Sequence, residues 1–441
     1  MFNKAFFVSM FLCVTMFSAL AQKELYVSSA TGNNRNDGSK GSPFKNIQKA
    51  IDEATDGSTI YVAEGNYFGM LDNGTITVNK PVKIIGGYSP DFSKRDVLKH
   101  MSLIQPSAAS NGTAHQQGTV QIDVKKPGTE VVIDGFIIDR GNTISYNARG
   151  EGKPEGVESP MMNAIGTAGI GGPDLTTTNV TTKQSSTFYL NNISCDLVIK
   201  NCAFLNSPFH GIVGTVQGSK VTITNNIFIG NRFSAVEING GSASKNAEIY
   251  FSYNTILFTW SRLRDLADMG YGYRFGTRAN SYVTNNIIGL SIFAGLDRTR
   301  VDSDRAKEAQ RITTAENNIF FLNKQGDLTL PGGGMFMRIN VDQFDDVDQL
   351  AKAGGNKSLT DPKVFKGIIN EPYLNGFLSV SYEEKTSVDP NSSANQFRQA
   401  MGMNIQGTMQ SSVTMFANRY PWKDALKFFG AMKGYGAQAI K

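Results

Sequence analysis

The chain is poor in cysteine and tryptophan, and it has no long run of charge of one sign. Its 441 residues include three cysteines and two tryptophans. Cys195 and Cys202 flank the apolar run 197–199. An extended strand rises about 3.3 Å per residue, so their Cα atoms would lie beyond the ~7 Å limit for a disulfide. We therefore expect two buried free thiols, and a fold stabilised by a large hydrophobic core.

The charge balance does not support nucleic-acid binding. Lys and Arg number 43 and Asp and Glu number 38, which gives a formal net charge of +5 without long basic runs. This small excess allows a weak preference for acidic polymers. Short apolar segments between Gly, Asn and Asp turns favour an all-β architecture.

The N-terminus has the pattern of a secretory signal peptide. Lys4 precedes the apolar run 5–20, and Ala-Leu-Ala at 19–21 supplies small residues for cleavage. A membrane anchor is the alternative, but the run is shorter than the ~20 residues that span a bilayer. We expect residues 1–21 to be removed. The mature chain, without a transmembrane segment, would then be secreted to the periplasm, the cell surface or the medium.

A pattern of strand, Asx or Gly turn and second strand recurs along the chain. The aligned turn residues are Asp134, Asn201, Asn225, Tyr253, Asn285 and Asn317, at spacings of 67, 24, 28, 32 and 32 residues. Units of this size bury their apolar faces by stacking on their neighbours, as in a solenoid.

The next position of each unit is also specialised. It holds Gly135, Cys202, Asn226, Asn254, Asn286 and Asn318. Gly and Asn tolerate a left-handed backbone, and stacked Asn side chains can form hydrogen bonds between coils. We interpret this column as an asparagine ladder in the scaffold. A glycan or metal site built from these asparagines is the alternative.

Two features resemble right-handed parallel β-helix proteins of the pectate-lyase-like superfamily: the NNIF-like repeats and the segment ELYVSSATGNNRNDGSKGSPFKNIQKAIDEATDGSTIYVAEGNY at 24–67. The resemblance covers most of the mature chain and implies an all-β, right-handed parallel β-helix. Apolar residues at helical spacing predict a helix over 47–54 that caps the first open end of the solenoid. The superfamily includes lyases, glycosidases, epimerases and inert surface proteins, so the resemblance does not specify a reaction.

We expect the β-helix domain to span 22–360, with an irregular insert at about 141–192 that is rich in Gly, Thr and Ser. Long loops on a solenoid commonly shape a groove, although a disordered flap is the alternative. The repeat fades in 361–441, where 392–404 and 422–439 have helical patterns. We expect this region to form a coil and helical cap on the second open edge. A helix on a membrane surface is the alternative.

Candidate catalytic acids recur in register with the repeat. Glu237, Asp265 and Asp297 would point outward together from successive coils, because alternate residues of a strand face the same way. With strands ~4.8 Å apart, the first pair would be roughly 5 Å apart and the outer pair roughly 10 Å apart. These distances bracket the separations in retaining and inverting glycosidases. Arg264 interrupts the inward pattern and indicates that its coil can be shifted.

Ordinary surface ion pairs are the alternative explanation for these acids. Arg232, Arg262 and Arg298 are close enough in the sequence to pair with them, and exposed pairs are weak indicators of function.

His210 is a candidate general base. It shares the register of Ser234 and Arg262, and Arg232 is near. Proton abstraction beside a uronate carboxylate needs a base of this kind and an Arg that neutralises the carboxylate. An inert exposed His is the alternative.

The segment 260–278 combines aromatic rings with arginines. Aromatic faces stack on sugars, and Arg binds carboxylates or sulfates in a bidentate manner. The expected substrate-binding residues are Arg232, Trp260, Arg262, Arg264, Tyr271, Tyr273 and Arg274. A structural loop that packs its aromatics on the solenoid is an equal alternative.

The chain departs from known enzymes of this fold. We find neither the strand Lys and Arg-His-Gly motifs of alginate lyases and chondroitinase B nor the Asp motifs of polygalacturonases. The acid column could bind calcium, but the neighbouring Arg residues disfavour a high-affinity ion, so we expect no metal and no cofactor, with calcium as the unsupported alternative. The sequence favours a secreted carbohydrate-active protein that acts on or binds a polysaccharide, with an anionic one as an option, as a lyase or glycoside hydrolase. A non-catalytic cell-surface adhesin or glycan-binding protein is the alternative. The substrate and the oligomeric state are left open.

Overall fold

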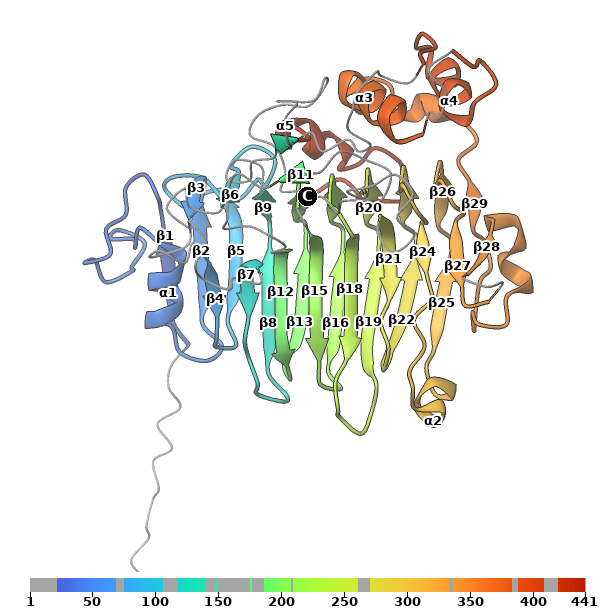
Figure 1. Cartoon of the computed structure of the whole chain (residues 1–441). Helices are drawn as coiled ribbons and strands as arrows, with labels where there is room; N and C mark the ends of the chain where they lie inside the picture. The colour runs from blue at the N-terminus through green and yellow to red at the C-terminus, as the bar shows by residue number, and fades with distance from the viewer. Residues whose placement is uncertain are drawn as a thin grey trace, which may run out of the picture.

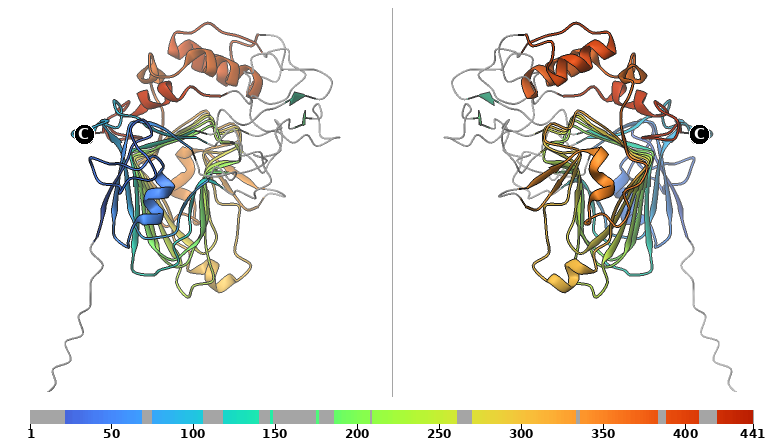
Figure 2. Two further views of the ribbon diagram at one scale, coloured as in Figure 1. Left: turned by 90° about the vertical axis from the view of Figure 1, so that its left-hand side faces the viewer. Right: turned by 90° about the vertical axis from the view of Figure 1, so that its right-hand side faces the viewer.

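The computed structural model describes residues 22–68, 75–105, 118–139, 147–148, 175–176, 186–207, 209–260, 270–332, 336–382, 388–407 and 419–440. Three nine-stranded sheets dominate these residues and run side by side along one axis (Figure 1). We number the sheets in the order in which each coil of the chain visits them. Viewed along the axis, successive strands superpose and the C-terminal helices lie to one side (Figure 2).

The three sheets draw one strand from each coil. Sheet 1 contains β1 (Glu24–Val27), β2 (Thr59–Ala63), β5 (Lys83–Tyr88), β8 (Glu130–Asp134), β13 (Asp196–Lys200), β16 (Lys220–Thr224), β19 (Ala247–Ser252), β22 (Ala279–Thr284) and β25 (Thr313–Glu316). Sheet 2 contains β3 (Gly65–Phe68), β6 (Ser102–Gln105), β9 (Phe136–Asp139), β14 (Ala203–Leu205), β17 (Ile227–Ile229), β20 (Thr255–Leu257), β23 (Ile287–Gly289), β26 (Ile319–Phe321) and β29 (Lys357–Ser358). Sheet 3 contains β4 (Ile76–Val78), β7 (Gly118–Ile122), β12 (Ser186–Ile193), β15 (His210–Val216), β18 (Ser234–Gly240), β21 (Tyr271–Phe275), β24 (Leu296–Asp297), β27 (Leu328–Leu330) and β28 (Met337–Ile339).

Strands of successive coils pair in parallel and in register. In sheet 1, for example, Val221 pairs with Leu197 of the preceding coil and Ile249 of the following one. The final strand of sheet 3, β28, is antiparallel to β27 and ends this sheet. The topology confirms the right-handed parallel β-helix expected from the sequence.

The asparagine ladder is present at the turn between sheets 1 and 2. The side-chain Nδ2 of Asn226 donates to Oδ1 of Asn254 at 3.0 Å, and the same contact links Asn254 to Asn286 at 3.2 Å and Asn286 to Asn318 at 2.9 Å. All four residues are fully buried. The row continues to Asn356, which the sequence pattern did not reveal. Matching positions of successive coils therefore lie directly over one another.

The turn residue that precedes each ladder position has a left-handed backbone. The φ angles of Asn225, Tyr253, Asn285 and Asn317 lie between 54° and 58°. Asn adopts this conformation at low cost, whereas a bulky aromatic residue such as Tyr does not. Tyr253 is therefore the strained member of the column.

A continuous hydrophobic core fills the space between the sheets, from Leu25 near one end to Leu350 near the other. Aromatic rings of successive coils stack within it: Phe204 and Phe228 have centroids 4.9 Å apart and an interplanar angle of 10°. Full burial of such a side chain stabilises the fold by about 1.5–3 kcal/mol. The two thiols, Cys195 and Cys202, are free and buried in this core, as predicted.

The first open end of the core is covered by α1 (Ile47–Glu53), which buries Ile47, Ala50 and Ile51. This is the helix expected from the apolar spacing. At the other end, the 3-10 helix η3 (Val341–Asp346) inserts Val341 and Phe344 into the same core. A short helix, α2 (Arg305–Ala309), lies in the connection between sheets 3 and 1.

The C-terminal region contains helices, but they do not lie over the second open edge. η4 (Pro362–Phe365), α3 (Glu371–Ser381), α4 (Ser393–Met401), α5 (Trp422–Ala425) and η5 (Leu426–Phe428) contribute to a separate hydrophobic cluster on the outer face of sheet 2 (Figure 1). The segment 422–439 is helical only to Phe428, because Gly430, Gly434 and Gly436 adopt positive φ angles beyond it. The apolar stripe therefore packs sideways on the solenoid.

The last described residues cross several coils of the solenoid. We call residues 420–438 the strap. The backbone N–H of Tyr420 donates to Asn206, that of Ala437 to Thr255 and that of Gly436 to the carbonyl of Asn285. The strap thus contacts coils that are far apart in the sequence.

The expected insert at 141–192 is shorter at its end, because residues from Ser186 onward form β12 and pair in register with β7 and β15. Within it, β10 (Asn147–Ala148) and β11 (Leu175–Thr176) form an antiparallel pair, and its other residues before 186 lie outside the described ones. The expected signal peptide, 1–21, also lies outside them. Among the described helices, none has both the length and the apolar character that crossing a bilayer requires.

Candidate functional site

Charged residues lie on the outer face of sheet 3, on β18, β21 and β24. These three strands are neighbours in the sheet (Figure 1). Val236, Tyr273 and Leu296 point inward and are fully buried in the core. Their neighbours Glu237, Arg274 and Asp297 therefore face outward, since side chains alternate along a strand. The strand register places Glu237 beside Arg274 and Arg274 beside Asp297.

This register corrects the expected column of three acids. The coil between Glu237 and Asp297 supplies Arg274, so Asp265 does not stand between them. The reason is loop length: the chain leaves β20 at Leu257 and enters sheet 3 again only at Tyr271. The alignment that selected Asp265 assumed a shorter connection. Asp265, Arg262 and Arg264 lie in 261–269, outside the described residues.

Arg274 connects the two carboxylates. Its Nε lies 2.6 Å from Oδ2 of Asp297, and its Nη1 lies 3.8 Å from Oε2 of Glu237. Glu237, Asp297 and Arg274 are 3%, 0% and 7% exposed. Buried charges persist only when they are paired, because removing one partner leaves an uncompensated charge at a cost of about 3–5 kcal/mol.

Further hydrogen bonds occupy Asp297. Its Oδ1 accepts from the hydroxyl of Thr329 at 2.8 Å and from the backbone N–H of Thr299 at 3.1 Å. Both carboxylate oxygens of Asp297 are thus engaged with the protein. Glu237 has a second cationic partner, Arg300, whose side chain is 43% exposed. Arg300 is the point at which the cluster meets solvent.

His210 belongs to the same region. Its Nδ1 lies 2.6 Å from Oγ of Ser234, its partner in the neighbouring strand. Burial holds the pKa of His210 well below its usual range, and the charges of Arg274, Arg300 and Arg232 lower it further. The imidazole is therefore neutral at physiological pH and retains an unprotonated nitrogen.

Aromatic rings surround His210 and Arg274. The rings of Phe209 and Phe233 lie 4.2 and 4.8 Å from the His210 ring, measured between centroids. Tyr271 lies beneath the guanidinium of Arg274 at 4.6 Å. Such cation–π contacts orient an arginine and reduce its freedom to move.

Three other expected binding residues have different environments. Tyr273 points into the core, where its hydroxyl bonds to Ser281 at 3.2 Å. Trp260 is buried in the cluster on sheet 2, and its indole N–H donates to the carbonyl of Gly230 at 3.0 Å. Arg232 is buried and pairs through its backbone with Trp260. None of the three presents an exposed face to a sugar, because Tyr273 faces the core from β21, Trp260 is covered by the cluster on sheet 2, and Arg232 is buried.

The structure therefore brings together His210, Glu237, Tyr271, Arg274 and Asp297 of the expected residues. It adds Arg300, which sequence reasoning missed although it follows Asp297 by only three positions. The segment LDRTR at 296–300 is the one available signal. Within the described part of the chain, His, Cys, Asp and Glu side chains form no group of three that could hold a metal ion.

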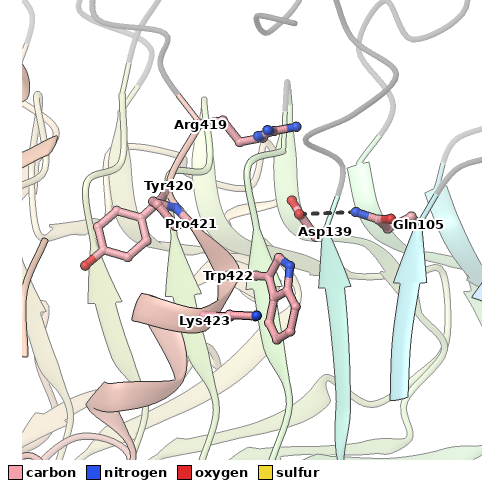
Figure 3. Close-up of a pocket in the computed structure, with 7 residues that line it drawn as sticks. All are labelled: Gln105, Asp139, Arg419, Tyr420, Pro421, Trp422 and Lys423. Carbon is pink, nitrogen blue, oxygen red and sulfur yellow. Dashed lines mark hydrogen bonds between the residues drawn. The ribbon is translucent and has the colours of Figure 1, made fainter. Parts of the chain in front are cut away.

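A second candidate site lies on the outer face of sheet 2, next to the strap (Figure 3). It is a cavity of about 380 Å³. Its lining residues are Gln105, Asp139, Arg419, Tyr420, Pro421, Trp422 and Lys423. Asp139 accepts a hydrogen bond from Asn206 at 2.8 Å, and Asn206 also donates to the carbonyl of Tyr420 at 3.0 Å. One buried side chain thus holds both walls of this cavity in place.

Comparison with solved structures finds similarity to a rhamnogalacturonan lyase (TM-score 0.36, 11% identity, 74% of this chain and 89% of that one). It also finds similarity to the pectate lyase Pel9A (TM-score 0.33, 12% identity, 71% and 78% of the two chains). A pectin methylesterase in complex with a hexasaccharide gives a TM-score of 0.34 at 12% identity, over 77% and 94%. A search of curated proteins gave no match. A family model matches residues 30–335, and the chain therefore belongs to the family described as "Protein of unknown function (DUF1565)".

Proposed function

We propose that the protein acts on an anionic polysaccharide at the outer face of sheet 3, as a lyase. The single observation that carries the proposal is a buried His210 whose Nδ1 lies 2.6 Å from Oγ of Ser234, close enough to Arg274 and Arg300 for their charges to act on it. Breaking a uronate chain by elimination requires a base for the proton beside the carboxylate and positive charge for the electrons that move onto that carboxylate. In this proposal His210 would be the base, and Arg274 and Arg300 would supply the positive charge.

In the proposed step, the free nitrogen of His210 accepts the proton next to the substrate carboxylate. The C–H electron pair forms a double bond, and the glycosidic C–O bond at the adjacent carbon breaks. Water protonates the departing oxygen. Arg300, the solvent-facing partner of Glu237, would exchange part of its pairing to hold the incoming carboxylate.

A glycoside hydrolase is less well supported, because it needs two carboxyl groups that both face the scissile bond. Both carboxylate oxygens of Asp297 already contact the protein, at Arg274, Thr329 and Thr299. We therefore assign Asp297 and Arg274 positioning roles. Export of the chain through residues 1–21 is part of the proposal, and the mass of the mature protein tests it.

The proposal is tested by incubating the purified protein with uronate-containing and neutral glycans and following ultraviolet absorbance from unsaturated products. We expect absorbance with a uronate glycan, and its loss in His210→Gln. His100→Gln is the matched control, since His100 pairs with Glu64 in another part of the solenoid. Reducing ends without absorbance, or full activity in His210→Gln, would contradict the assignment.

A glycan-binding protein without turnover is the second candidate function, and the cavity in Figure 3 favours it. Trp422 is only partly buried there, and the Nζ of Lys423 lies 5.4 Å from the centre of its ring. An accessible indole with nearby cations is suited to stacking on an acidic sugar. Binding without products in the wild type, lost in Trp422→Ala and retained in His210→Gln, would support this second candidate.

A further inference from the structure

A different cavity, of about 460 Å³, lies near the second end of the solenoid. It is bounded by the connection that carries α2, by the start of β25, and by the segment 348–351 that follows η3. Its lining residues are Arg298, Val301, Asp302, Arg305, Glu308, Ala309, Arg311, Thr313, Asp348, Gln349 and Ala351. None of the residues proposed to take part in cleavage lines it.

Three residues that line this cavity carry hydrogen-bond donors without partners. Among the described residues, Nε of Arg298, Nε and Nη2 of Arg311 and the hydroxyl of Thr313 are buried and have no hydrogen-bond partner. The three residues are 6%, 8% and 1% exposed. Buried polar atoms in native proteins are almost always satisfied, because an unpaired buried donor destabilises the fold. Four such atoms at one cavity indicate a ligand that accepts hydrogen bonds.

The arrangement of charges around the cavity also indicates a ligand that accepts hydrogen bonds, and specifically an anion. Arg298 and Arg311 share a single carboxylate: Glu308 pairs with Nη2 of Arg298 and lies 3.1 Å from Nη1 of Arg311. Burial and the nearby Arg298 lower the pKa of Arg311 to about 10. Two buried guanidiniums thus repel each other across one shared partner.

Two further carboxylates line the cavity, and the charge of one of them, Asp302, also acts on Arg311. Asp302 binds Nε of Arg278 at 2.7 Å, outside the cavity lining. Asp348 is exposed. Arg305 adds a further positive charge to the lining. An anion that enters the cavity would meet the unpaired donors and would relieve the repulsion between the guanidiniums, while the carboxylates of Glu308 and Asp302 are already paired with arginines.

We propose that this cavity binds a tetrahedral oxyanion, sulfate or phosphate, either free or as an ester group on a sugar. Guanidinium N–H groups and a hydroxyl are the donors that such oxygens require. The cavity falls within the usual range for small-ligand sites, about 300–1,000 Å³, so it has room for the sugar that carries the group. The site goes beyond the proposed cleavage at sheet 3 and does not depend on it.

The test measures the thermal midpoint of unfolding against sodium sulfate and sodium phosphate, with sodium chloride at equal ionic strength as the salt control. We expect a saturable rise with sulfate or phosphate beyond that with chloride, because a ligand that binds only the folded state stabilises it. Galactose 6-sulfate is titrated in parallel. Tighter binding of this sugar by tenfold or more assigns the site to a sulfate ester, and equal binding assigns it to the free anion.

Thr313→Val is the most informative variant, because it removes a hydroxyl that has no partner in the protein. The ligand-free midpoint should stay the same or rise, whereas sulfate binding should weaken about tenfold, the equivalent of one hydrogen bond of ~1.4 kcal/mol to a charged group. Arg311→Met should abolish binding if that variant folds. Arg338→Gln, at an exposed position on β28, is the matched arginine control and should bind like the wild type.

Two results would overturn the proposal. One is a response to sulfate and phosphate no greater than the response to chloride. The other is unchanged sulfate affinity in Thr313→Val. Because neither measurement uses polysaccharide cleavage, failure here leaves the proposed function at sheet 3 standing, and loss of the cleavage proposal leaves this site standing.

Discussion

Replacing Asn254 with Ala should cause one of the largest losses of stability available from a single polar substitution in this fold. Oδ1 of Asn254 accepts from the backbone N–H of Asn226 at 2.9 Å, and its Nδ2 donates to the carbonyl of Ile223 at 3.0 Å. Water cannot replace these partners, because Asn226 and Asn254 are fully buried.

The expected cost follows from the groups left behind. An unsatisfied buried N–H costs about 1–3 kcal/mol, and the lost bonds of Nδ2 add about 1–2 kcal/mol. The free energy of unfolding should therefore fall by about 3–5 kcal/mol, a large part of the ~5–15 kcal/mol typical of a folded protein. Urea denaturation followed by tryptophan fluorescence measures this change.

Asn356→Ala is the matched control, because Asn356 occupies the last position of the same ladder but is only half-buried. Removing the half-buried Asn356 side chain opens a path for water to the N–H of Asn318, so its loss should cost about 1 kcal/mol. If Asn254→Ala costs no more than Asn356→Ala, the ladder does not stabilise the turn in the way described.

Three further predictions concern other parts of the chain. Tyr253→Asn should raise the free energy of unfolding by about 1 kcal/mol, since φ of Tyr253 is 54° and Asn relieves the left-handed strain; a decrease in urea denaturation would contradict this. The pKa of His210 is lower in the folded state than in the unfolded state, so the unfolded state binds more protons below about pH 6.5. The free energy of unfolding should therefore fall as the pH drops below about 6.5, by up to ~1.4 kcal/mol per pH unit. This slope should disappear in His210→Gln, measured by urea titrations at several pH values. Burial raises the pKa of the Cys195 and Cys202 thiols to about 12, so neither should react with a thiol reagent at pH 8 until urea unfolds the protein.

The scaffold was predictable because its determinants are local. A left-handed turn followed by a buried amide favours the pair Asn-Asn, and that pair can be read directly in NNIF. The sequence pattern did not identify Asn356 as a ladder residue, because it follows Gly354-Gly355 and no repeat-like strand precedes it. The helix at 47–53 was visible for the same reason, since its apolar spacing lies within one short segment.

The site was only partly predictable, because it depends on how loops between strands return to sheet 3. A longer connection before β21 placed Arg274, and not Asp265, beside Glu237. The pairing of Glu237 with Arg300 brings together residues 63 positions apart through the path of a loop. The apolar stripe that begins at Trp422 predicted that this segment packs against another part of the protein. It did not indicate that the packing partner is the outer face of sheet 2.

The strap has a consequence for the order in which the protein acquires its structure. A stack of repeats in contact only with their neighbours can form progressively as the chain emerges and can lose one end without the other. Tyr420, Gly436 and Ala437 tie the coils of Asn206, Asn285 and Thr255 to residues that are synthesised after all three of these coils. These contacts can therefore form only after residues 420–437 have left the ribosome, and once formed they should make the connected coils unfold as one unit.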